Sequence, residues 1–143
     1  MKILKGAWTG VLVLVIWYGC SPTMALYDQA TFDKTISVKV DILDLMDSAV
    51  RPYQTQLGTI RTVNLELLKL YEYEKNRPNN SITIAQFHIL MDSSSNGHLY
   101  TSFLKLWSTE KVLKSAYIEA KKEQIGKALD QIEMLESKKI RKT

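Results

Sequence analysis

The stretch DSSSNGHLYTSF, residues 92–103, carries oxygen-bearing side chains at the spacing of a calcium-binding loop. Asp92, Ser94 and Asn96 hold its first, third and fifth positions, and a glycine holds the sixth. A calcium loop of this length also needs a bidentate carboxylate at its twelfth position, where this chain has Phe103. We therefore predict that the segment turns the chain between two helices, with its Asn-Gly pair at the reversal, and does not bind calcium.

His88, Asp92 and His98 are the other residues whose types could do chemistry. His88 and Asp92 lie four residues apart on one face of a predicted helix, and His98 follows the turn, so the three could form a zinc site. The chain has only 2 histidines, and a solvated or locally hydrogen-bonded pair is the preferred interpretation. The sequence lacks a nucleophile elbow, an HExxH helix and a glycine-rich phosphate loop. We expect no metal, no cofactor and no enzymatic activity.

The longest predicted element is a helical rod over residues 32–71. Two tracks of positions, each with a seven-residue spacing, predict one apolar stripe along it. The apolar and aromatic members of these tracks are Phe32, Ile36, Leu43, Met46, Val50, Tyr53, Leu57, Ile60, Leu67 and Tyr71. Pro52 removes one backbone hydrogen bond, so the rod either kinks or breaks there. The stripe keeps its phase across Pro52, which favours a kinked, continuous helix.

Three shorter helices are predicted after a stop and turn at residues 77–80. They cover residues 83–91, residues 99–107, and a last helix from Ser108 or Thr109 to about residue 137. Thr83 is expected to cap the first of these helices. Apolar residues at 118, 125 and 132 define the buried face of the last one. The sequence therefore predicts an all-α fold, a small antiparallel bundle of about four helices.

Two charged stretches are predicted to be solvent-exposed helix ends. Residues 71–74 alternate tyrosine with glutamate at the end of the long rod. Residues 138–142, KKIRK, hold four basic side chains that favour the negative end of a helix dipole. The alternative for this basic tail is contact with anionic lipid.

Composition predicts one globular domain. At 143 residues the chain is long enough to bury a single core. Residues 1–19 carry two of its net +4 charges, so the remainder is too balanced to predict nucleic-acid binding. The single cysteine, Cys20, excludes an intrachain disulfide.

The first twenty residues, MKILKGAWTGVLVLVIWYGC, are typical of an export signal. Two lysines precede an apolar run that ends in Gly-Cys. Only 14 residues separate Lys5 from Cys20, fewer than the roughly 20 that span a bilayer. We therefore predict a cleaved signal peptide over residues 1–19 and not a permanent membrane helix.

The end of this signal, Trp17-Tyr18-Gly19-Cys20, resembles the lipobox of bacterial lipoproteins. Gly19 and Cys20 match that pattern, whereas Trp17 and Tyr18 stand where a leucine and a small residue are usual. The resemblance implies cleavage before Cys20, acylation of its thiol and of the new N-terminus, and a membrane anchor. Ser21 is similar to the residue that follows the cysteine in outer-membrane lipoproteins. The resemblance thus predicts a small Gram-negative envelope lipoprotein on the outer membrane, facing the periplasm.

This interpretation divides the chain into a signal peptide (1–19), a tether (20–29) and a helical bundle domain (30–143). The anchored domain is expected to be a non-enzymatic scaffold or adaptor for another envelope protein. Its long first helix is the expected contact surface, and neither nucleic acid nor a small-molecule substrate is expected as a partner.

The sequence leaves a second processing route open. Thr23 and Ala25 place small residues at the two positions that ordinary signal peptidase reads, and cleavage there releases a soluble protein beginning at Leu26. A soluble periplasmic bundle of this kind is expected to hold a small apolar molecule between its helices.

Overall fold

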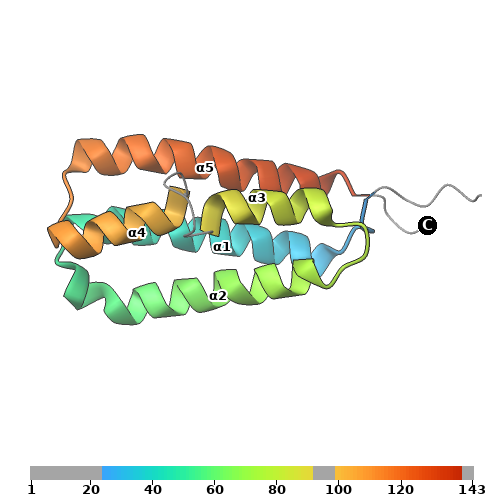
Figure 1. The fold of residues 1–143 in the computed structure, drawn as a ribbon, viewed down its shortest axis with the longest axis horizontal. Coiled ribbons are helices and arrows are strands. Elements are labelled where there is room, and N and C mark those ends of the chain that lie inside the picture. Colours follow the sequence, from blue (N-terminus) through green and yellow to red (C-terminus); the bar gives the residue numbers. More distant parts are fainter. Residues whose placement is uncertain (1–23, 92–98, 140–143) are drawn as a thin grey trace, which may run out of the picture.

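The computed structural model describes residues 24–91 and 99–139, which form five α-helices and two short 3₁₀ turns (Figure 1). These residues contain no β-strand, so the prediction of an all-α fold is confirmed. In chain order the elements are α1 (Gln29–Asp47), η1 (Ser48–Val50), η2 (Tyr53–Gln56), α2 (Leu57–Lys75), α3 (Ser81–Met91), α4 (Leu99–Glu110) and α5 (Ser115–Ser137).

The predicted rod over residues 32–71 is two helices, α1 and α2, which lie side by side and run in opposite directions (Figure 1). The chain reverses at Pro52, whose ring forces the preceding residue out of the helical region. Arg51 is accordingly extended, with φ −102° and ψ 159°, and its carbonyl accepts a hydrogen bond of 3.0 Å from the indole of Trp107. The prediction of a kinked, continuous helix is therefore wrong. The reversal also explains why five helices are present where about four were expected.

Each helix buries one stripe. α1 packs against α5 and α2, and α3 packs against α5, α4 and α2. In Figure 1, α3 and α4 follow one another in the same direction between α2 and α5. The largest fully buried apolar side chains come from α1, α3, α4 and α5: Ile42, Leu45, Met46, Phe87, Leu90, Phe103, Trp107, Ile118, Ile125 and Ile132.

The seven-residue spacing predicts the core of α5 correctly and that of α1 poorly. Ile118, Ile125 and Ile132 are all at most 2% exposed. On α1 the predicted stripe runs along the edge of the buried face, so Ile36 is 36% exposed while Thr35 is only 2% exposed. The hydroxyl of Thr35 is satisfied inside the helix by the carbonyl of Thr31, so it can face the core.

The last helix begins at Ser115 and not at Ser108 or Thr109, because α4 continues to Glu110. The hydroxyls of Ser108 and Thr109 donate to the carbonyl of Lys105 within α4, at 2.7 and 2.9 Å, instead of capping a new helix. Lys111 then reverses the chain with a positive φ of 67°.

Both termini of the described chain lie at the same end of the helical body, on the right of Figure 1. Residues 24–28 enter there, and α5 ends there. We call this the strap end and residues 24–28 the strap. Of the helices that the structure describes, none is long and apolar enough to cross a membrane.

Candidate functional site

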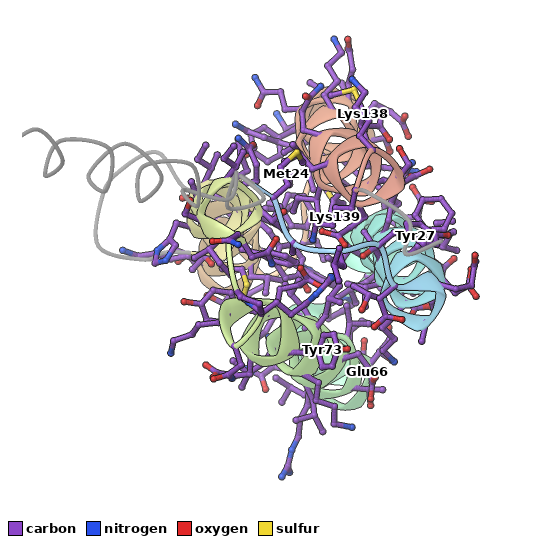
Figure 2. The ribbon with its side chains drawn as sticks, turned by 90° about the vertical axis from the view of Figure 1, so that its right-hand side faces the viewer. Met24, Tyr27, Glu66, Tyr73, Lys138 and Lys139 are labelled. Atoms are coloured by element: carbon purple, nitrogen blue, oxygen red, sulfur yellow. The ribbon has the colours of Figure 1, made fainter. Side chains whose placement is uncertain are left out.

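Residues 24–28, the strap, run across this end of the helical body, as the segment from Met24 to Tyr27 shows in Figure 2. It is packed there: Ala25 is only 2% exposed, and the carbonyl of Leu26 accepts a hydrogen bond from the guanidinium of Arg77. The ring of Tyr27 lies 6.2 Å from that of Phe32. The described part of the predicted tether is thus built into the helical body.

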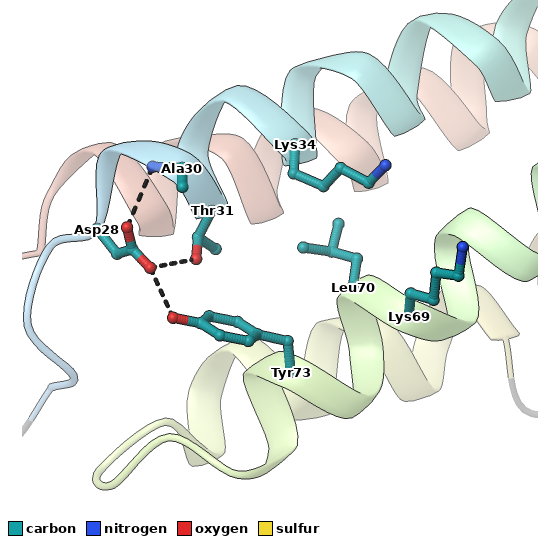
Figure 3. A pocket seen from close by; sticks show the side chains of 7 residues that line it. All are labelled: Asp28, Ala30, Thr31, Lys34, Lys69, Leu70 and Tyr73. Atoms are coloured by element: carbon teal, nitrogen blue, oxygen red, sulfur yellow. Dashed lines mark hydrogen bonds between the residues drawn. The ribbon is translucent and has the colours of Figure 1, made fainter.

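Asp28 joins the strap to two helices (Figure 3). It is the N-cap of α1, and its Oδ1 accepts a hydrogen bond of 3.1 Å from the backbone N–H of Ala30. Its Oδ2 accepts from the hydroxyl of Thr31 at 2.9 Å and from the hydroxyl of Tyr73 on α2 at 2.7 Å. The hydrogen bond from Tyr73 is the main cause that lowers the pKa of Asp28, since it stabilises the carboxylate.

Four ionic side chains lie beneath the strap, and we call them the ion cluster: Glu74, Arg77, Glu136 and Lys139. Glu74 and Glu136 are at most 1% exposed, and the side chain of Lys139 is also 1% exposed. The ammonium of Lys139 lies 3.0 Å from Glu74 and pairs with Glu136 as well. Arg77 contacts the same two carboxylates at 2.7 and 3.1 Å. Two cations therefore balance two anions inside the protein.

Neighbouring polar groups complete the hydrogen bonding of the ion cluster. The amide of Asn80 donates to the backbone carbonyl of Glu74 at 2.8 Å and also contacts its carboxylate. The hydroxyl of Thr83 donates to Glu136 at 3.3 Å. The prediction that Thr83 caps its helix is therefore wrong, because α3 begins at Ser81 and Thr83 faces the core. Burial raises the pKa of Glu136.

Helical spacing holds the signal that could have predicted this cluster. Glu74 lies seven residues after the buried Leu67, and Glu136 lies seven after the buried Leu129, so both acids continue an apolar stripe. The expectation that residues 71–74 are a surface end is wrong for Glu74. The expectation of a solvated basic tail is likewise wrong for Lys139, whose partners come from two helices that the sequence does not pair.

A groove of about 280 Å³ opens beside the strap, between α1 and α2 (Figure 3). Leu70 and the methyl of Ala30 form part of its wall, and Lys34 and Lys69 lie along it. Both lysines pair with Glu66, which lowers the pKa of that carboxyl to about 2. The groove thus offers an apolar wall and partly neutralised cations, which suits the binding of a ligand.

Of the residues that the sequence singled out, Cys20, Asp92 and His98 lie outside the described residues. His88 is exposed on α3, with its Nε2 3.5 Å from the hydroxyl of Tyr71. Within residues 24–91 and 99–139, no three His, Cys, Asp or Glu side chains come together as a metal site. Phe103, the twelfth residue of the calcium-like loop, is fully buried on α4.

No family model, curated protein or solved structure matches this chain.

The large core side chains Phe87, Phe103 and Trp107 are fully buried between the helices, and the rings of Phe103 and Trp107 lie 6.3 Å apart. The groove between α1 and α2 is open at the surface. The candidate site is the strap end, where the N-terminal segment, the ion cluster and four helices meet.

Proposed function

We propose that this chain is a membrane-anchored lipoprotein of the bacterial cell envelope, acylated at Cys20, and that it serves as a non-enzymatic scaffold for another envelope protein. In this proposal the five helices form an antiparallel bundle that hangs from the outer membrane and faces the periplasm. The packed strap is the observation that carries the proposal, because it joins the anchored segment rigidly to the bundle.

The strap supports an anchor that also orients the bundle. Cys20 lies four positions before Met24, a span of at most about 14 Å for an extended chain. An acylated Cys20 would therefore hold the strap end close to the lipid headgroups and direct the opposite end away from the membrane. Several acyl chains, at about 0.8 kcal/mol for each buried methylene, make such an anchor effectively permanent.

The burial of Ala25 supports cleavage before Cys20 over cleavage after Ala25. The second cut would remove a side chain that is 2% exposed in the folded protein. It would also create a new ammonium on Leu26, the residue whose carbonyl already accepts a hydrogen bond from Arg77. A positive charge next to a guanidinium is unfavourable, so a retained strap fits the packing better.

The intact mass of the protein extracted from membranes tests the anchor directly. We expect a chain that begins at Cys20 and carries diacylglycerol and an N-acyl group, and we expect the Cys20→Ala variant to keep its signal peptide. A soluble periplasmic chain beginning at Leu26 would refute the anchored scaffold. Crosslinking in intact cells tests the second half, and the absence of any reproducible protein adduct would count against it.

A further inference from the structure

The end of the helical body opposite the strap is formed by two turns: residues 48–56 between α1 and α2, and residues 110–114, which run from the last residue of α4 to the start of α5. It lies on the left of Figure 1. We call it the distal tip. If the strap end faces a membrane, as proposed above, the distal tip is the part of the protein that points furthest from it.

Hydrogen bonds fix the two turns of the distal tip to each other. The backbone N–H of Tyr53 donates to the carbonyl of Lys111 at 2.8 Å, and that of Leu113 donates to the carbonyl of Ala49 at 2.9 Å. Beneath them, the ring of Tyr53 meets that of Trp107 edge-on at 5.3 Å. A surface held in this way loses little conformational entropy when a partner binds it.

The distal tip exposes an apolar centre. Val50 is 52% exposed and Val112 is 47% exposed, and they belong to the two turns that the hydrogen bonds join. Pro52 is exposed in the same turn as Val50. Small apolar side chains on a rigid protrusion suit the centre of a protein–protein contact.

Basic side chains accompany this centre. The two turns contain three basic residues, Arg51, Lys111 and Lys114, and one acidic residue, Glu110. Their net charge is therefore +2. All four residues are exposed. Among the described residues, Lys111, Lys114 and Glu110 make no ion pair, so the charge of both lysines is available to a partner.

Lys111 is also held in an unfavourable backbone conformation. Its φ of 67° lies in the left-handed region, which glycine or asparagine adopts at a helix C-terminus with less strain. Residues kept in such a conformation cluster at functional surfaces. Lysine at this position makes the fold less stable than glycine would, and it places a positive charge on the distal tip.

From these features we propose that the distal tip is the docking surface for the partner protein, and that it fits an acidic surface patch with an apolar centre. This inference rests on the proposed scaffold function and moves the contact from the long first helix to the two turns. A protein is favoured over a lipid surface because side chains that enter bilayer interfaces are typically Trp, Phe or Leu, whereas the tip exposes valine and proline.

Photo-crosslinking in cells that express the full-length chain tests the docking surface. A photo-reactive phenylalanine analogue is placed at Val112, and in a control at Val40, which is 57% exposed on α1. We expect a protein adduct from position 112, joined to a peptide rich in Asp and Glu, and about tenfold less of it when Lys111→Glu and Lys114→Glu are combined. The proposal would be overturned by an adduct found only at position 40, or by an adduct at position 112 whose yield the charge reversal does not change. A lipid adduct, or no adduct at all, would also overturn it.

The Lys111→Gly variant distinguishes an effect on docking from an effect on the stability of the fold. We expect the urea midpoint to rise, since glycine relieves the positive φ, and the adduct yield at position 112 to fall. An unchanged yield would refute a role for this lysine. The intact mass of the chain with the native Cys20, measured on the same cells, separates the two proposals: an adduct from a chain whose Cys20 is unacylated supports the tip and refutes the anchor, whereas an acylated chain without an adduct does the reverse.

Discussion

Replacing Lys139 with methionine is expected to destabilise the protein by about 3–5 kcal/mol, because it removes one cation from the buried ion cluster. At an effective dielectric constant of 20, the contact of 3.0 Å with Glu74 alone is worth about 5.5 kcal/mol before desolvation is subtracted. Methionine keeps most of the side-chain volume, so the cost is mainly electrostatic. Arg77 still contacts both carboxylates, which places the expected value near the lower end, at about 3 kcal/mol.

The assay is urea unfolding followed by far-UV circular dichroism, on a soluble form that begins at residue 20 with Cys20→Ser. Lys127→Met is the matched control, on α5, the helix that Lys139 follows. Lys127 pairs with Glu123 at 2.6 Å, but its side chain is 71% exposed, so its replacement should cost less than about 0.5 kcal/mol.

Neutralising one acid should rescue the Lys139→Met variant. Adding Glu136→Gln leaves Glu74 opposite Arg77, and we expect it to recover at least half of the lost stability. Lowering the pH should act in the same direction. Glu136 has a raised pKa in the folded protein, and loss of the ammonium raises it further, so the cost of Lys139→Met should shrink as Glu136 takes up a proton.

Two results would refute this reasoning. A Lys139→Met protein within 1 kcal/mol of the parent would mean that the cluster is solvated or that its charges contribute little. A double variant no more stable than the single one would mean that the loss comes from packing and not from unbalanced charge.

Three further predictions use the same unfolding assays. The pKa of Glu66 is lowered to about 2, so this carboxylate contributes stability that is complete above about pH 4.5 and is lost as the pH falls towards 2. In thermal melts, the difference in melting temperature between the parent and Glu66→Gln should therefore shrink across that range. Trp107→Phe leaves the carbonyl of Arg51 without its 3.0 Å hydrogen bond, and a loss of about 2–3 kcal/mol in urea is expected; a loss below 1 kcal/mol would show that water replaces the indole. A chain beginning at Leu26 should be about 1 kcal/mol less stable than one beginning at residue 20, and equal midpoints would mean that the burial of Ala25 is not important.

Local signals predicted the helices themselves and several of their ends. The turn at residues 77–80 separates α2 from α3, as its proline and asparagines predict. The buried face of α5 follows from its seven-residue spacing. These features depend on residues close together in the chain, and short-range backbone preferences and side-chain spacing are sufficient to specify them.

The fold around Pro52 could not be predicted in the same way. A proline within an apolar stripe is compatible with a kink, a break or a full reversal, and all three preserve the local pattern. The reversal is stabilised by contacts from α4 and the turn that follows it, among them the hydrogen bond from Trp107 on α4 to Arg51 and that from Tyr53 to Lys111 in the turn. That turn lies more than fifty residues away in the sequence, and the local pattern carries no information about it.

The sequence by itself determined the helical class and the positions of most helices, because these depend on composition, periodicity and short motifs; the lipid anchor at Cys20 is a prediction from the same kind of signal. Only the tertiary structure decided that the first rod folds back on itself, that Glu74, Glu136 and Lys139 become a buried ion cluster beneath the strap, and that the two turns of the distal tip meet. The physical reason is the same in each case. A charge can be buried, or a turn held rigid, only where its partners arrive from distant parts of the chain, and packing brings those partners together.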